Sequence, residues 1–188
     1  MGRVIVTGFV SLDGIVTDPD GSGGTPAGGW AFRHGPETTG GDKFRLGELM
    51  DTGVLLLGRT TWELFGGLWP HRTDEFSRRM NKMAKVVVSR TLTDVSSWSN
   101  SSLLEGELTD YVRSEPRTIA VTGSLGVIRA LQAADLVDEY RLMTFPDIVG
   151  AGSRLFGPAD APVRLQLTSL VHSGAASLAT YERAVPSS

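Results

Sequence analysis

Short apolar runs alternate with amphipathic stretches along most of the chain. Apolar runs rich in β-branched residues predict buried strands at 3–10, 54–57, 85–89, 118–122 and 140–145. Apolar residues at helical spacing predict helices at 37–50, 60–65, 73–83, 104–114 and 125–134, with Thr73 as the N-cap of the third. Because the strands are apolar runs separated by helices, we expect a parallel sheet that is covered on both faces.

The C-terminal part has a different pattern. Apolar and polar residues alternate on either side of Ser173 and Gly174, which is typical of an antiparallel β-hairpin. The sequence therefore predicts an α/β fold whose mixed, mainly parallel sheet is flanked by helices and ends in an antiparallel C-terminal hairpin. No repeat or linker is visible, so residues 1–188 are expected to form a single domain.

Composition and charge exclude several classes of protein. The chain has 188 residues, of which 40% are hydrophobic and 21% charged, and its net charge of −3 provides no basic field for nucleic acid. No apolar run reaches about 18 residues, so we expect no membrane span. The N-terminus lacks the apolar core of a signal peptide, which makes the cytoplasm the expected location.

Metal and thiol chemistry are disfavoured as well. The chain contains no cysteine, and its three histidines, His34, His71 and His172, are isolated and show no ligand spacing. We therefore expect no metal site. Glycine, by contrast, is frequent, and the Asp-, Gly- and Pro-rich residues 17–29 predict a long flexible loop of the kind that often covers a functional site.

Three predicted strands end in the same kind of sequence. They lead into GRTT, SRT and TGSLG, which begin at Gly58, Ser89 and Thr122. Two of these ends supply an arginine, all three supply hydroxyl groups, and two open a helix. Because the carboxyl ends of parallel strands meet at one edge, and because helix N-termini attract anions, this edge is predicted to bind several phosphates. A dinucleotide is the natural candidate, although the G-x-G-x-x-G pattern is absent.

Each of these residues also has an ordinary structural explanation. Arg59 could pair with Glu63 one helical turn later. Ser89 and Thr91 could cap turns, and Gly123 could form a tight turn. It is the occurrence of all three loops at one edge that favours the phosphate site.

The motifs also resemble those of a known family. SLDG, LLLGRTTWE, KVVVSRTL, TGSLGVIRALQAADLVDEYRL and FPDIVGAGSRLF occur in the order and spacing of the dihydrofolate-reductase-like superfamily. Within it, the chain resembles the C-terminal reductase domain of the bifunctional riboflavin-biosynthesis deaminase–reductase and its stand-alone relatives. The resemblance runs almost from end to end, and it implies an enzyme, an NADPH-dependent reductase.

The resemblance implies a set of cofactor-binding residues. The cofactor phosphates would be held by Gly58, Arg59 and Thr61. The adenosine 2′-phosphate, which distinguishes NADPH from NADH, would be recognised by Ser89 and Arg90. The pyrophosphate would lie on Gly123, Ser124, Leu125 and Gly126, a loop that departs from the family's run of glycines at its two central residues. The nicotinamide would be bordered by Asp13, Gly14, Ile15 and the loop through Trp30.

On the substrate side, a hydride would pass from nicotinamide C4 to the carbon of a C=N or C=O group. Asp13 is the first candidate for the catalytic polar group, although Leu-Asp-Gly is also a common turn. Trp30 and Pro146 would border the substrate, and Arg154 would meet an anionic tail. A structural role at a strand start is favoured for the Asp-Glu pair that precedes Tyr140.

The favoured reaction is that of 5-amino-6-(5-phosphoribosylamino)uracil reductase, in which a ribosyl group becomes a ribityl group. The cysteines needed by the zinc site of the deaminase partner are absent. Pterin reduction of the dihydrofolate reductase type is an alternative, but the first acid after Trp30 is Glu37, which is the wrong spacing. A non-catalytic NADPH-binding dimeric protein is a further alternative. A serine hydrolase is disfavoured because Ser124 directly follows Gly123.

The expected partners are a small-molecule substrate and a second copy of the chain. The relatives that the chain resembles are commonly homodimers, and the alternation in the C-terminal strands leaves a face that could pair. The same strands could equally complete the core of the monomer.

Overall fold

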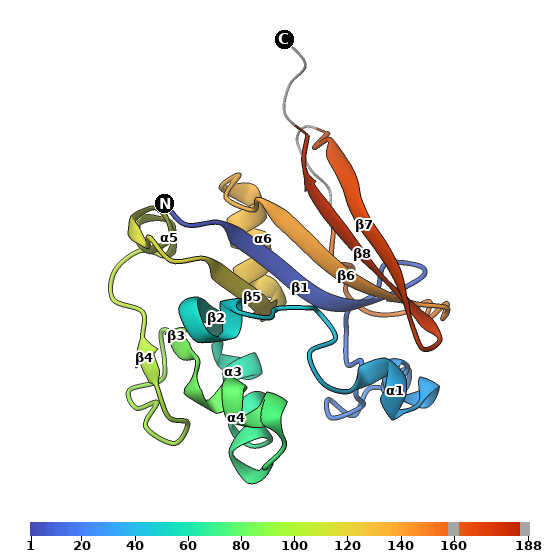
Figure 1. Cartoon of the computed structure of the whole chain (residues 1–188), viewed down its shortest axis with the longest axis horizontal. Coiled ribbons are helices and arrows are strands. Elements are labelled where there is room, and N and C mark those ends of the chain that lie inside the picture. The colour runs from blue at the N-terminus through green and yellow to red at the C-terminus, as the bar shows by residue number, and fades with distance from the viewer. Residues whose placement is uncertain (158–161, 185–188) are drawn as a thin grey trace. The chain divides into compact units, whose positions relative to one another are not determined.

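The computed structural model describes residues 1–157 and 162–184. Contacts divide the chain into two compact units. The first unit contains Met1–Val6 and Leu46–Asp138, and the second contains Thr7–Arg45 and Glu139–Ser188. Strand β1, Val4–Ser11, contributes residues to both units (Figure 1).

The first unit is built on a parallel sheet. Its further strands are β2 (Val54–Gly58), β3 (Ala84–Val88), β4 (Ser101–Leu103) and β5 (Ile119–Gly123). The order is β4-β3-β2-β5-β1, and every one of these pairings is parallel. Gly58 pairs with Val88, and Leu57 pairs with Gly123 after a shift in register. The ends of β2, β3 and β5 are therefore neighbours at one edge of the sheet.

Burial explains the sequence of the central strands. Every residue of β2 is buried, as are Ile119, Ala120 and Val121 of β5. A parallel strand that is covered on both faces has no polar side, so its sequence is a continuous apolar run. The helices of this unit are α2 (Leu49–Thr52), α3 (Arg59–Gly66), α4 (Glu75–Lys82), α5 (Leu108–Ser114) and α6 (Leu125–Ala133), with the 3₁₀ turn η2 (Trp69–His71). None of the helices in the described part of the chain has the length and apolar character needed to cross a bilayer.

The second unit combines antiparallel strands with short helical turns. Its elements are η1 (Ala31–His34), α1 (Pro36–Thr39), β6 (Glu139–Phe145), β7 (Leu165–Ser173) and β8 (Ala176–Arg183). β8 pairs antiparallel with both β6 and β7, and β6 is the neighbour of β1. The turn between β7 and β8 contains Gly174 with a φ of 58°. The strand order β4-β3-β2-β5-β1-β6-β8-β7 confirms the predicted mixed, mainly parallel sheet with its C-terminal hairpin.

The predicted helix over 37–50 is wrong. Only Pro36–Thr39 and Leu49–Thr52 are helical in this region. Gly41, Arg45 and Gly47 between them have φ values of 62°, 52° and 52°. A backbone with positive φ cannot continue a right-handed helix, so the helical spacing of the apolar residues here is misleading.

Smaller differences have local causes. The N-cap of α4 is Asp74 rather than Thr73, because the Asp74 carboxylate accepts a hydrogen bond from the Ser77 backbone N–H at 3.0 Å. α5 begins at Leu108, since Gly106 has a φ of 79°. The short strand β4 lies in a segment predicted to be a connection. The other predicted elements are confirmed with ends shifted by one or two residues.

A buried carboxylate fixes the segment that leads into β5. The Glu115 side chain is 7% exposed and accepts hydrogen bonds from Nε and Nη2 of Arg117 at 2.8 and 2.9 Å, and from the Tyr111 hydroxyl at 2.9 Å. The hydrogen bonds from Arg117 are the main cause that lowers the pKa of Glu115 from 4.5 to about 2. Because this pKa is lower in the folded state, the stabilisation is present above about pH 4.5 and is lost as the pH falls toward 2.

We therefore expect Glu115→Gln to lower the free energy of unfolding at pH 7 by about 1 to 2 kcal/mol, since hydrogen bonds to a charged group are lost. The difference between wild type and variant should shrink between pH 5 and pH 3. Urea unfolding followed by circular dichroism measures both quantities. Asp110→Asn, an exposed change on the preceding helix α5, is the control and should cost less than about 0.5 kcal/mol. A difference that is independent of pH would contradict the assignment.

Candidate functional site

The ends of β2 and β5 approach each other so closely that only glycine fits. A Cβ added to Gly58 would lie 2.0 Å from Oγ and 3.1 Å from the backbone N of Ser124. A Cβ added to Gly123 would lie 2.7 Å from Oγ1 of Thr61, and Gly123 has a φ of 143°, which favours glycine. A cis peptide bond joins Gly123 to Ser124. The structure thus brings together Gly58, Thr61, Gly123 and Ser124, all of which were predicted to bind phosphates.

Two helices begin at this point. α3 starts at Arg59 with Gly58 as its N-cap, and α6 starts at Leu125 with Ser124 as its N-cap. Gly58 has no side chain, and the Ser124 side chain forms no hydrogen bond with the start of α6. The first backbone N–H groups of both helices are therefore left for another partner. Gly126, in the first turn of α6, is exposed, and a Cβ there would have no atom within 4 Å. These N-termini can therefore accept an anion.

The end of β3 forms a hydrogen-bonded turn. The Ser89 Oγ accepts from the backbone N–H groups of Thr91 and Leu92 at 3.1 and 3.0 Å. This is the structural role that hydroxyls at such positions commonly have. Binding of a 2′-phosphate by Ser89 stays a prediction.

The two arginines at this edge differ in their contacts. Arg59 donates to the Thr91 hydroxyl at 3.3 Å, and its Nε lies 3.9 Å from the Glu63 carboxylate. Both members of the Arg59–Glu63 pair are about half exposed, so the pair is weak. Arg90 is exposed and makes no hydrogen bond or ion pair with any described residue. Its guanidinium is therefore available to a ligand.

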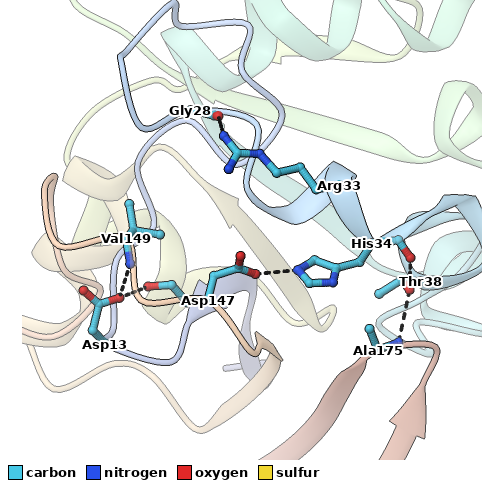
Figure 2. A network of polar contacts seen from close by, with 9 residues as sticks. Asp13, Gly28, Arg33, His34, Thr38, Asp147, Val149 and Ala175 are labelled. Atoms are coloured by element: carbon cyan, nitrogen blue, oxygen red, sulfur yellow. Dashed lines mark hydrogen bonds and ion pairs between the residues drawn. The ribbon is translucent and has the colours of Figure 1, made fainter.

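In the second unit, Asp13 ties two loops together. Its carboxylate accepts from the Ser11 hydroxyl at 2.6 Å and from the backbone N–H groups of Val149 and Gly150 at 3.1 and 2.8 Å. Figure 2 shows the contact with Val149. These hydrogen bonds, that from Ser11 first, lower the pKa of Asp13 to about 2. Such a carboxyl is ionised at neutral pH and has no proton to donate. The geometry thus favours a loop-positioning role, and the catalytic role of Asp13 stays a prediction.

The residues around Asp13 form one connected turn. Arg154 donates through Nη1 to the Asp13 carbonyl, and it forms a β-bridge with Ile15. The Leu155 N–H donates to the Gly14 carbonyl at 3.0 Å, and Gly14 has a φ of 85°. Ile15 is only 2% exposed and belongs to the core. Arg154 is exposed, as a role in binding an anionic tail requires.

The loop over residues 17–29 is held by hydrogen bonds to one aspartate. The Asp18 carboxylate accepts from the N–H of Gly23 at 2.7 Å and from the N–H and hydroxyl of Thr25 at 2.9 and 2.8 Å. A Cβ at Gly28 would lie 2.2 Å from the same carboxylate. Residues 17–29 contain no helix or strand, as the composition predicts, and one aspartate satisfies several backbone donors that a loop would otherwise leave to water.

Trp30 and Pro146 have different surroundings. Trp30 is 1% exposed, and its indole N–H donates to the Thr17 carbonyl at 2.9 Å. Its ring packs against Phe145 at 5.6 Å. Trp30 thus anchors the loop from inside, and this geometry gives no support to the predicted contact with substrate. Pro146 follows Phe145 and is exposed, so a contact with substrate stays a prediction for it.

Sequence reasoning missed a polar pair close to these residues. Nε2 of His34 lies 2.5 Å from the Asp147 carboxylate, and the two side chains are 20% and 24% exposed. The pair joins the end of η1 to the loop after β6 (Figure 2). His34 is isolated in the sequence, and the two residues are 113 positions apart, so no spacing could have revealed the contact.

A comparison with protein families finds one match over most of the chain. The model of the RibD C-terminal domain matches residues 3–178, a stretch that includes parts of both units. Among curated proteins, the uncharacterised protein YyaP of Bacillus subtilis (strain 168) is 26% identical over 124 residues, which are 62% of this chain and 65% of YyaP. The match thus spans slightly less than two thirds of that relative.

Solved structures share the fold. A protein from Shewanella sp. PV-4, described as a candidate riboflavin biosynthesis protein, is 23% identical with a TM-score of 0.74, covering 97% of this chain and 99% of its own. Dihydrofolate reductase from Enterococcus faecalis, solved with NADP(H), is 15% identical with a TM-score of 0.57, covering 97% of this chain and 96% of its own. At these identities the likeness establishes the dihydrofolate-reductase-like fold.

The approach of Gly58 to Ser124 predicts a sharp effect of a single methyl group. Gly58→Ala should lower the free energy of unfolding by about 1 to 3 kcal/mol, because the backbone angles at Gly58 suit alanine but the space does not. Gly126→Ala, at an open helical position, is the matched control and should be neutral or stabilise by up to about 1 kcal/mol. Chemical denaturation of the two variants compares them.

A second-site change sharpens this test. Ser124→Gly removes the Oγ and Cβ that the new methyl group would meet, so the double variant should recover part of the lost stability. Equal stability of Gly58→Ala and Gly126→Ala would contradict the packing described for the two strand ends.

Proposed function

The chain belongs to the RibD C-terminal domain family, and we propose that it is an NADPH-dependent reductase that transfers a hydride to a small heterocyclic or carbonyl substrate. Within that class, the proposed reaction is of the 5-amino-6-(5-phosphoribosylamino)uracil reductase type. Membership of the family supports a reductase activity. The strand ends of the first unit support binding of the cofactor.

One observation carries the proposal. Gly58 and Gly123 let two helix N-termini begin side by side, with Ser124 against one and Thr61 against the other. The groups gathered there are backbone donors, hydroxyls and exposed arginines, and no described carboxylate other than the weakly held Glu63 is in contact with them. This donor set fits a ligand with several phosphate groups.

The residues of the first unit fit NADPH on chemical grounds. The N-terminal turns of α3 and α6 would hold the pyrophosphate through backbone N–H groups. Arg90, whose guanidinium has no other described partner, would form charge-assisted hydrogen bonds with the 2′-phosphate. Arg59 would bind a further phosphate oxygen while its contact with Thr91 keeps it in place. When bound, the cofactor supplies the hydride at nicotinamide C4.

The substrate-side roles belong to the second unit. Asp13 would hold the loop around Val149 and Gly150 in position through its ionised carboxylate. Arg154 would bind an anionic group of the substrate, such as the phosphate of a phosphoribosyl moiety. The buried Trp30 would keep the loop over residues 17–29 in its hydrogen-bonded form.

We also propose that the protein is a homodimer that pairs through β7. Leu167 and Leu170 are 50% and 61% exposed, and the register with β8 puts both on one face of the strand. β7 is the last strand in the order, so its outer backbone groups are not paired within the sheet. A second copy would cover both features.

The first test is the discrimination between NADPH and NADH. Arg90→Ala should raise the Kd for NADPH by about 10- to 100-fold and leave the Kd for NADH nearly unchanged, because only NADPH carries the 2′-phosphate. Titration followed by nicotinamide fluorescence measures both constants. Arg113→Ala, which removes another exposed arginine from α5, is the control and should alter neither. Equal losses for the two cofactors would overturn the assignment of Arg90.

A charged side chain placed on the exposed face of β7 tests the proposed dimer. Leu170→Glu should shift the protein toward the monomer in sedimentation velocity, because an ionised carboxylate cannot be buried unpaired in an interface. Gln166→Glu adds the same charge on the opposite face of β7 and should leave the dimer intact. A wild-type protein that sediments as a monomer at micromolar concentration would refute the proposal.

A further inference from the structure

The His34–Asp147 pair has the geometry of an oriented imidazole. The carboxylate lies 2.5 Å from Nε2, and about four fifths of each side chain is shielded from solvent. An exposed ion pair is weakened by water and by the mobility of its side chains, whereas a shielded and short one fixes the ring. Asp147 therefore determines which nitrogen of His34 is turned away from it.

Both partners are held in place by other contacts. The Asp147 carbonyl accepts from the Leu12 N–H at 2.9 Å, which joins it to the segment before Asp13. The His34 carbonyl accepts from the Thr38 hydroxyl at 2.9 Å, and the His34 ring packs against Phe145 at 5.6 Å. Figure 2 shows the imidazole reaching from η1 toward the Asp147 carboxylate. Such preorganisation is what a group needs if it is to act at a fixed position.

The second ring nitrogen is not used by the fold. Nδ1 of His34 makes no hydrogen bond with any described residue. In the described part of the chain, the one buried side-chain nitrogen or oxygen without a hydrogen-bond partner is Trp69 Nε1. His34 Nδ1 has no partner either, so it is not buried. Nδ1 is therefore accessible. Asp147 is the charged group in contact with the ring, while the adjacent Arg33 turns away to the Gly28 carbonyl.

We propose that His34 is the proton donor of the reduction and that Asp147 is its positioning residue. The inference rests on the proposed function, because reduction of a C=O or C=N group needs a proton as well as a hydride. The hydride forms the new C–H bond, the π electrons of the double bond move to the oxygen or nitrogen, and the proton leaves His34 Nδ1 to form the O–H or N–H bond. The imidazole is then neutral and regains its proton from water.

Asp13 is a poorer donor than His34. Its carboxyl oxygens already accept three hydrogen bonds, and these hold its pKa at about 2. The arrangement of carboxylate, imidazole and free nitrogen instead matches the general pattern in which an acid orients a histidine. Asp147 touches no reacting atom in this scheme and acts through His34 alone.

The test uses the full chain with NADPH and 5-amino-6-(5-phosphoribosylamino)uracil, dihydrofolate serving as a second substrate. His34→Gln should lower kcat by about 100-fold or more, the usual contribution of a general acid, with an unchanged Kd for NADPH. Asp147→Asn should lower kcat by about 10- to 100-fold. His71→Gln, which removes an exposed histidine from η2, should have no effect.

A measurement without turnover checks the pair itself. Long-range ¹H–¹⁵N spectra of the imidazole rings should show neutral His34 protonated on Nε2 in the wild type and should lose this preference in Asp147→Asn. His34→Gln and Asp147→Asn should both unfold within a few degrees of the unfolding temperature of the wild type.

The outcomes separate the two proposals. A wild type that reduces neither compound although it binds NADPH would end the proposed function and the proton-donor role together. An active wild type whose His34→Gln variant keeps kcat within threefold would overturn the role of His34 alone. A neutral His34 protonated on Nδ1 would overturn the positioning by Asp147.

Discussion

The close approach of two neighbouring strand ends is the constraint on which the first unit depends. Parallel strands lie about 4.8 Å apart, and at the ends of β2 and β5 each chain turns at once into a helix. Both helices can begin there only because Gly58 and Gly123 lack side chains where Ser124 and Thr61 come into contact with them. The glycines therefore determine where two sets of unpaired N–H groups point, and the exposed arginines only add charge to a site that the backbone has already shaped.

The second unit contains long irregular segments that side chains hold in place. Such segments leave backbone N–H groups without partners, and here aspartates accept them. Asp13 takes those of Val149 and Gly150, and Asp18 takes those of Gly23 and Thr25. Asp147 departs from this pattern because the described bond of its carboxylate goes to a histidine side chain instead of to the backbone. In the proposed mechanism, this carboxylate orients the side chain that reacts.

The fold could be predicted where the signal was local or repeated. Continuous apolar runs identified β2, β3 and β5, and alternation identified the C-terminal hairpin, because burial on one or both faces imposes those patterns directly. The helix expected over 37–50 failed because positive φ values at Arg45 and its neighbouring glycines override a helical spacing.

The candidate site likewise contains residues that could be predicted from the sequence and a contact that could not. Gly58, Arg59 and Gly123 could be found because they follow strands whose ends must meet at one sheet edge. The contact between His34 and Asp147 could not, since it depends on how η1 and the loop after β6 pack.

The same difference affects how the proposed cofactor and the substrate would be recognised. The loops proposed to bind phosphate are shaped by backbone geometry, so they say little about the substrate. Substrate choice depends on a few side chains whose polar atoms remain available, and in the described part of the second unit His34 is one of them. An oriented imidazole accelerates reduction of a substrate that must receive its proton at a fixed point. It gives no such advantage where water protonates the substrate directly. In the proposed reaction, the histidine–aspartate pair would therefore favour a substrate whose reduced oxygen or nitrogen lies away from solvent.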